Sequence, residues 1–560
     1  MKQKLLPLLG FLLLASVYLV YWNDAEYVVD DWLHFDFYRQ AEGAGLREHL
    51  HVLKLLFDNQ LYRGVQVFWL SHWINCFLVW IFGYAPKIAF GLMVLLHALS
   101  AWLFYLLLAR LGVNRRIAFL AGAGLVLIPT AHGPLFWPLN CSFFVWPMFF
   151  LVIYLLQALQ VLEEDRLRRG AAVKLVLLTL LTLFAGSPAF ALLVLSLPWM
   201  AWCFFGRQRI RMALPVTALN WAVVAIALLL YPPLQGHNRP PKQLREQRYF
   251  YTYEKFSVNL SVTRMHLVNL TGLTTRSYYH VLRSPSPAVV GLLVALLVFL
   301  MAWRIDPSPG PSRLFRAGIF AAGMWVLAYL PIMFLHTKTL RHYYTFSPFL
   351  SLLVVLPAGV GLTSNSGRAW GVAWGAVLCG YFAACTVAET RQCWIPQSRH
   401  TQLVKHALAG LKNLSPGEWV IVPGVPLVVG TAPYFSIGGA PYDALFAKYV
   451  TGVPNLKFAR EIVLENGRLR FFHRYFMKDT SPEELHRSHV LAPDPDGGYS
   501  ARRYVAYERE PDRFQLLPLK GSDPPASGGG LLTRDQLRPL EKEIQFPKPF
   551  QHGHIEYLHY

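Results

Sequence analysis

The sequence predicts an all-α polytopic membrane protein that ends in a small soluble α/β domain. Of its 560 residues, 54% are hydrophobic and 15% are charged, a composition typical of membrane proteins. Apolar runs close to the ~20 residues that cross a bilayer recur through the first two thirds of the chain. After Ala388 they give way to short alternating segments, which are typical of a mixed α/β domain.

We expect about eleven transmembrane helices. The apolar runs that define them lie near residues 5–22, 87–109, 117–131, 141–162, 174–187, 189–205, 212–231, 288–303, 317–335, 346–362 and 369–388. The first run has no small-residue cleavage site, so we expect a retained helix and not a signal peptide.

The basic residues predict the orientation of the chain. If the N-terminus is cytoplasmic, Lys and Arg gather in alternate short connections, at 110–116, 166–174, 207–211, 304–316 and 368. The opposite connections, 130–140 and 186–188, contain neither residue. This asymmetry predicts a multi-pass protein of the plasma (inner) membrane with an external, periplasmic C-terminal domain. The net charge of +20 therefore reflects topology and does not indicate nucleic-acid binding.

Three domains are expected, a transmembrane domain (1–390), an external α/β domain (391–520) and a linker with a tail (521–560). The external domain should contain a helix at 400–412 and strands within 419–422, 468–476 and 503–507.

The first external loop is expected to hold two interfacial helices. Leu46, Leu50, Leu53 and Phe57 recur at helical spacing and give one apolar face among charged neighbours. A second helix is expected at Gly64–Phe82, because counting it as a span would break the charge asymmetry.

Asp30 and Asp31 closely follow the first apolar run. Two adjacent carboxylates are costly next to hydrocarbon, so they indicate chemistry, ion binding or a water-filled cavity. The alternative for such a pair is the start of a solvated loop.

Five stretches, taken in chain order, carry a resemblance. The acidic pair lies in Val28–Trp32, a Tyr-Arg step in Leu61–Arg63 and an internal His in Leu95–Leu99. Ile128–Trp137 follows the third span, and Leu340–Tyr344 precedes a late one. In this order the sequence resembles the GT-C superfamily of membrane glycosyltransferases, which use polyprenyl-phosphate-linked sugars. It is most similar to protein O-mannosyltransferases and their transmembrane, tetratricopeptide-associated relatives.

The resemblance implies a GT-C-like fold and transfer of a sugar from a polyprenyl-phosphate donor to an acceptor hydroxyl at the external face. It implies that Asp30 is the catalytic base, with Asp31 orienting or tuning it, since a neighbouring charge and burial raise a carboxyl pKa. The acceptor can be a glycan, a lipid or a protein.

The same resemblance makes Arg341 the main candidate for holding the donor phosphate, because a guanidinium grips phosphate with two hydrogen bonds. Snorkelling to lipid headgroups is the alternative. Weaker substrate-binding candidates are Lys338, His342 and Arg63, the last of which could instead pair with the acidic residues. His132 is a further candidate, for which a surface imidazole is the leading alternative, and His97 is expected to be a packing histidine.

The chain also departs from the family. Relatives place an acidic residue in the loop after the third span, where this chain offers only His132. Gly186-Ser187-Pro188 replaces a Lys-Glu pair after the fifth span. The six scattered cysteines indicate neither a zinc site nor a disulfide framework, and a requirement for a divalent metal is left open.

Two other readings remain. A transporter or flippase of lipid-linked glycans should show inverted repeats or charges at mid-membrane, and no repeat is visible. An inactive GT-C-like scaffold would fit the missing acidic residue.

Overall fold

The computed structural model of the chain describes part of its residues. These are 2–28, 31–39, 45–48, 50–51, 69–139, 141–164, 168–186, 190–230, 285–306, 313–332, 344–362, 367–411, 413–422, 428–429, 432–433, 442–459, 461–465, 468–472, 477–493, 499–501, 503–508, 513–516, 532–533 and 544–545. They fall into two compact units. The membrane unit comprises Met1–Ala25 and Tyr38–Arg391, and the C-terminal unit comprises Glu26–Phe37 and Gln392–Leu558.

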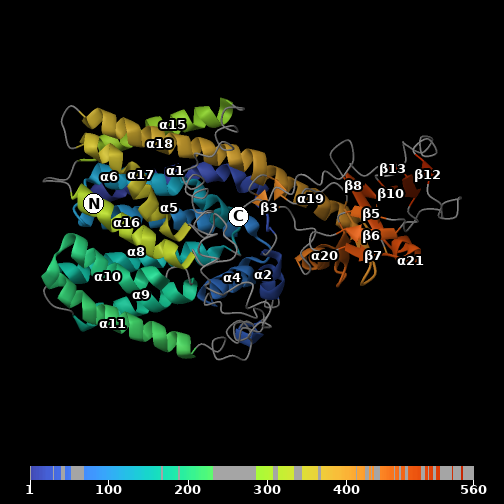
Figure 1. Cartoon of the computed structure of the whole chain (residues 1–560), viewed down its shortest axis with the longest axis horizontal. Helices are drawn as coiled ribbons and strands as arrows, with labels where there is room; N and C mark the ends of the chain where they lie inside the picture. The colour runs from blue at the N-terminus through green and yellow to red at the C-terminus, as the bar shows by residue number, and fades with distance from the viewer. Residues whose placement is uncertain are drawn as a thin grey trace. The chain divides into compact units, whose positions relative to one another are not determined.

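Within the described residues of the membrane unit, all of the regular elements are helices (Figure 1). Its helices are α1 (Lys2–Ala15) continuing as the 3-10 helix η1 (Ser16–Asp24), α4 (Trp69–Phe82), α5 (Pro86–Arg110), α6 (Arg115–Leu127), η3 (Pro129–Ala131), α7 (His132–Phe136), α8 (Ser142–Glu163), α9 (Arg169–Ala185), α10 (Phe190–Phe204), α11 (Arg207–Leu230), α15 (Pro285–Arg304), α16 (Leu314–Ile332), α17 (Ser347–Leu362) and α18 (Arg368–Glu389).

Each apolar run predicted as a span coincides with a helix of this unit. Among the described residues, six helices are long and apolar enough to cross a membrane, or seven if one bent pair counts as a span. The other predicted spans are shorter helices. The all-α membrane architecture and the small C-terminal α/β part expected from the sequence are confirmed.

The bent pair is α6 followed by η3 and α7, with an angle of 45° at the break. Pro129 causes the break, because it has no N–H to donate and it forces the residue before it out of helical geometry. Ile128 accordingly has φ −65° and ψ 135°. The chain turns there and restarts as α7 at His132.

Helices α15 and α18 lie side by side (Figure 1). Gly291 and Gly380 make this approach possible, since a Cβ added to Gly291 would lie 2.7 Å from the carbonyl oxygen of Gly380. Such small residues allow helix backbones to pack closely in a membrane, where dispersion replaces the hydrophobic effect as the driving force.

Helix α4 covers most of the segment expected to be the second interfacial helix. Its polar face is anchored on neighbouring helix ends: the Ser71 hydroxyl donates to the carbonyl oxygen of Ala185 at 2.6 Å. The Asn75 amide donates to the carbonyl oxygen of Leu139 and to the Ser142 hydroxyl, each at 2.9 Å. Of the first expected interfacial helix, Leu46 and Leu50 are exposed, whereas Leu53 and Phe57 lie outside the described residues.

The C-terminal unit contains helices and short strands. The π-helical turn η7 (Thr390–Trp394) leads into α19 (Ile395–Gly410), and α2 (Asp31–Tyr38), α20 (Tyr442–Thr451) and α21 (Pro482–His486) complete its helices among the described residues. The strands are β1 (Trp419–Ile421), β2 (Val428–Val429), β3 (Ala432–Pro433), β4 (Lys457–Ala459), β5 (Glu461–Glu465), β6 (Arg468–Phe472), β7 (Met477–Asp479), β8 (His489–Pro493), β9 (Tyr499–Ala501), β10 (Arg503–Glu508), β11 (Arg513–Leu516), β12 (Leu532–Thr533) and β13 (Ile544–Gln545).

These described strands form two main sheets. One has the order β4-β1-β8-β9, with β1 parallel to both β4 and β8. The other has the order β12-β11-β10-β5-β6-β7, with β13 added beside β10. Strands β12 and β13 come from the stretch expected to be linker and tail. Buried apolar side chains from both sheets pack together, as the stacked rings of Trp419 and Phe471 show at a centroid distance of 4.2 Å.

Candidate active site

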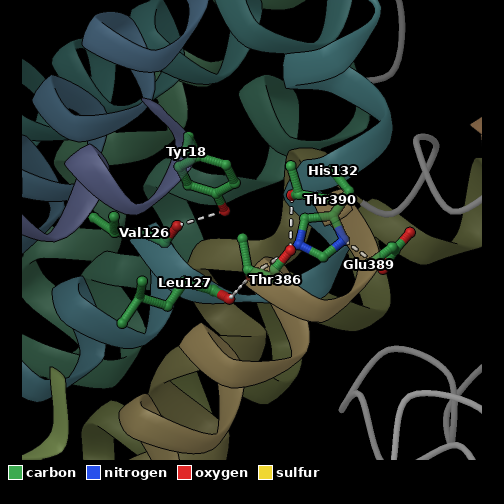
Figure 2. Close-up of polar contacts among 7 residues, drawn as sticks. All are labelled: Tyr18, Val126, Leu127, His132, Thr386, Glu389 and Thr390. Atoms are coloured by element: carbon green, nitrogen blue, oxygen red, sulfur yellow. Dashed lines mark hydrogen bonds and ion pairs between the residues drawn. The ribbon is translucent and has the colours of Figure 1, made fainter. Parts of the chain in front are cut away.

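The break in α6 creates the polar centre of the membrane unit. The last carbonyl groups of a helix have no partner within the helix, and in an apolar bundle other side chains must supply one. The Tyr18 hydroxyl donates to the carbonyl oxygen of Val126 at 2.8 Å, and the Thr386 hydroxyl donates to that of Leu127 at 3.3 Å (Figure 2). The first span and the last are thereby both bonded to the end of α6.

His132 lies at the start of α7, directly beyond this break. Its Nδ1 is 2.6 Å from Oε2 of Glu389, and its Nε2 is 2.8 Å from Oγ1 of Thr386 (Figure 2). The residue is 2% exposed, so the expectation of a surface imidazole is wrong. The bend at Pro129 turns the short helix back into the bundle, where Glu389 at the end of α18 supplies a carboxylate.

Both ring nitrogens of His132 therefore have a side-chain partner. The carboxylate of Glu389 on Nδ1 orients the ring, and the hydroxyl of Thr386 occupies the other nitrogen. With both nitrogens occupied in this way, His132 serves to fasten the loop after the third span to the last span.

A second buried histidine joins two of the stretches that carry the sequence resemblance. His97 Nδ1 lies 2.7 Å from the Tyr344 hydroxyl, 247 residues further along the chain. His97 Nε2 lies 3.1 Å from the carbonyl oxygen of Val126, which can only accept, so this nitrogen carries the proton. In the neutral ring, Nδ1 then accepts the hydroxyl hydrogen of Tyr344. The ring of Tyr18 lies edge-on to both histidines, 6.2 Å from His97 and 6.3 Å from His132.

Of the acidic pair, Asp31 is described and Asp30 lies outside the described residues. Asp31 is fully buried at the start of α2. Its Oδ2 accepts the N–H of Val28 at 3.2 Å, and its own N–H donates to the carbonyl oxygen of Val28 at 2.8 Å. A carboxylate in the first turn also interacts favourably with the helix dipole. These contacts suit a residue that fixes the turn.

Most of the other sequence-predicted binding residues lie outside the described residues. These are Arg63, Lys338, Arg341 and His342. The structure brings His132 together with Glu389, Thr386 and Tyr18, none of which was singled out from the sequence. One signal could have found Glu389: it is a carboxylate that directly follows the apolar run at 369–388.

In the described part of the chain, no group of three or more His, Cys, Asp or Glu side chains could hold a metal ion. All six cysteines are buried and none forms a disulfide.

Glu26, a few residues before the acidic pair, carries a buried carboxyl group. It is 4% exposed, and its Oε1 accepts the N–H of Tyr27 at 3.0 Å. Burial raises the pKa of the Glu26 carboxyl to about 7, although the charge of Lys405 and the Tyr27 N–H both act to lower it. Glu26 therefore titrates close to neutral pH.

The contact between His132 and Glu389 should be worth more than a surface ion pair. In a double-mutant cycle with His132→Ala and Glu389→Ala, measured by chemical unfolding in detergent, we expect a coupling of about 1–3 kcal/mol. Arg110 and Glu163, an ion pair with side chains 41% and 38% exposed, provide the control, at about 0.2–1 kcal/mol. Equal coupling in both cycles would contradict the fastening role of His132.

The buried Glu26 carboxyl should make stability depend on pH. Because its folded pKa is raised, its contribution to stability is complete below the unfolded value of 4.5 and is lost as pH rises through about 7. Glu26→Gln removes this titration, so the wild-type Tm should fall relative to that of the variant between about pH 5 and about pH 8. Melting curves of both proteins across that range test this, and parallel pH dependences would contradict it.

The chain was also compared with known proteins. No protein-family model matches it, and no curated protein does. Among solved structures, it is similar to the crystal structure of ArnT from Cupriavidus metallidurans bound to undecaprenyl phosphate. The two share 15% sequence identity, the match covers 79% of this chain and 89% of that one, and the TM-score is 0.36. A likeness of this size carries no argument about activity, so the functional conclusion depends on this chain's own residues.

Proposed function

We propose that the protein is a membrane glycosyltransferase that moves a sugar from a polyprenyl-phosphate donor to an acceptor hydroxyl at the external face. The observation that carries the proposal is the meeting of distant motif stretches at one buried centre. His97 and Tyr344 are hydrogen-bonded at 2.7 Å, and both lie in stretches that carry the resemblance to GT-C enzymes. His97 is also bonded to Val126 at the end of α6, two residues before the stretch 128–137.

In this proposal Asp30 is the base. The acceptor hydroxyl gives its proton to the Asp30 carboxylate, and the acceptor oxygen forms a bond to the anomeric carbon of the sugar. The bond from that carbon to the phosphate oxygen breaks, and polyprenyl phosphate leaves with the bonding electrons. A positioned base contributes about 10²–10⁴-fold to such a step.

Asp31 has a separate part in the proposal. Its carboxylate already accepts the N–H of Val28, so it is engaged in shaping the turn at the start of α2. This supports a positioning role for Asp31 and leaves the reacting role to its neighbour. Fixing the turn matters because a small misplacement of a catalytic group is costly in rate.

Cationic side chains complete the proposed site. The leaving phosphate needs positive charge, which Arg341 would supply with two parallel hydrogen bonds. Arg341 precedes Tyr344 by three residues in the sequence, and Tyr344 is hydrogen-bonded to His97. Lys338, His342 and Arg63 would add to the positive charge.

Asp30→Asn tests the proposed base. An amide keeps the shape of the side chain but cannot accept the acceptor's proton, so transfer should fall by at least about 10²-fold while expression and membrane insertion stay normal. Turnover of a lipid-linked sugar by the purified variant is the measurement. Asp24→Asn, the same change at the end of the first span, is the matched control and should retain activity. Near-normal turnover in Asp30→Asn removes this residue from the mechanism.

Arg341→Ala and Arg341→Lys together test the proposed phosphate contact. The alanine variant should weaken donor binding, and not acceptor binding, by about 1.5–3 kcal/mol. The lysine variant should recover only part of the lost donor-binding free energy, because a lysine ammonium is a point charge whereas a guanidinium donates two parallel hydrogen bonds. Donor titrations measure both. Full function in Arg341→Lys would instead indicate that the side chain only snorkels to the lipid headgroups.

A further inference from the structure

Helix α2, which begins at Asp31, belongs to the same compact unit as the C-terminal part of the chain. The unit joins Glu26–Phe37 with residues from Gln392 onward. The segment that follows the acidic pair is thus held by elements more than 350 residues away in the sequence. Side chains of α20 contact this segment.

Aromatic rings make the closest part of this contact. The ring of Trp32 lies 4.9 Å from that of Phe446 and 5.6 Å from that of Tyr449. The ring of Phe35 lies 5.2 Å from Tyr449 and perpendicular to it. Trp32 and Phe35 are each 1% exposed, and Phe446 is fully buried. Aromatic pairs at these distances contribute beyond the area that they bury.

Charged groups add to the contact between α2 and α20, one helical turn beyond Trp32. Lys448 Nζ donates to Asp36 Oδ1 at 3.0 Å and lies 3.4 Å from Oδ2. Lys405 of α19 lies over the ring of Tyr449, 5.5 Å from its centre. Trp32, Phe35 and Asp36 follow one another at helical spacing, so one face of α2 makes all of these contacts.

This face is close in sequence to the proposed base. Trp32 comes two residues after Asp30, and the buried Asp31 separates them. Asp31 and Trp32 both lie in the first turn of α2, so the contacts that fix Trp32 also restrain Asp31. Misplacement of a catalytic group by about 1 Å can lower the rate by about 10²-fold. The contacts at Trp32 should therefore affect the rate of transfer.

We propose that α20 positions the acidic pair for catalysis, with Tyr449 and Lys448 as positioning residues. The inference rests on the proposed function, because it assumes that Asp30 is the base. Tyr449 and Lys448 touch α2 and have no assigned contact with substrate.

The kinetic test uses full-length protein and the transfer assay. Tyr449→Ala should lower kcat by about tenfold or more while the donor KM changes little, because the base is displaced and the donor site is not. Tyr449→Phe keeps the ring and should restore kcat. Arg470→Ala, which breaks the comparable ion pair with Asp479 in the same unit, is the control and should leave kcat unchanged.

A charge exchange tests the contact at Lys448. Asp36→Lys and Lys448→Asp should each lower kcat, and the double variant should recover it, since the ion pair is restored with reversed signs. Failure of the double variant to recover, or a full kcat in Tyr449→Ala, overturns the positioning role.

Hydrogen exchange separates this inference from the proposed function. In full-length protein, Tyr449→Ala should speed exchange of the backbone amides in residues 26–38, whereas Tyr449→Phe and Arg470→Ala should not. Unchanged exchange overturns the claim that α20 holds the segment, whatever the activity. Faster exchange with unchanged kcat overturns the positioning role alone. If even wild-type protein transfers no sugar, the proposed function fails, and with it the catalytic role of α20.

Discussion

The break of α6 at Pro129 is the constraint on which the arrangement of the membrane unit depends. It leaves the carbonyl groups of Val126 and Leu127 without partners in surroundings where neither water nor lipid can supply them. Side chains from three other helices satisfy them, namely Tyr18, His97 and Thr386. Helices η1, α5 and α18 are thereby fixed around one point.

The same constraint organises the two buried histidines, His97 and His132, and their side-chain partners. Because α7 restarts after the break, His132 meets Glu389, and because His97 donates to Val126, its other nitrogen is available to Tyr344. Three of the five motif stretches, those that contain His97, His132 and Tyr344, thus lie near one another.

The sequence predicted the positions of the helices well, and the side-chain contacts between helices poorly. Long apolar runs identify spans, and each predicted run coincides with a helix, because burial in lipid requires a local pattern that a single sequence carries. Contacts across the bundle carry no such pattern. The partner of His132 lies 257 residues away, so its burial was missed. The anchoring of Trp32 by Phe446 depends in the same way on tertiary packing.

The most direct test of the account is an assay of the purified protein with a panel of polyprenyl-phosphate sugars. If the protein is a glycosyltransferase, at least one lipid-linked sugar should be consumed when an acceptor extract is added, with release of polyprenyl phosphate. Asp30→Asn protein should leave the same donor intact. Consumption of no donor by folded wild-type protein would contradict the account and favour a scaffold or a transporter.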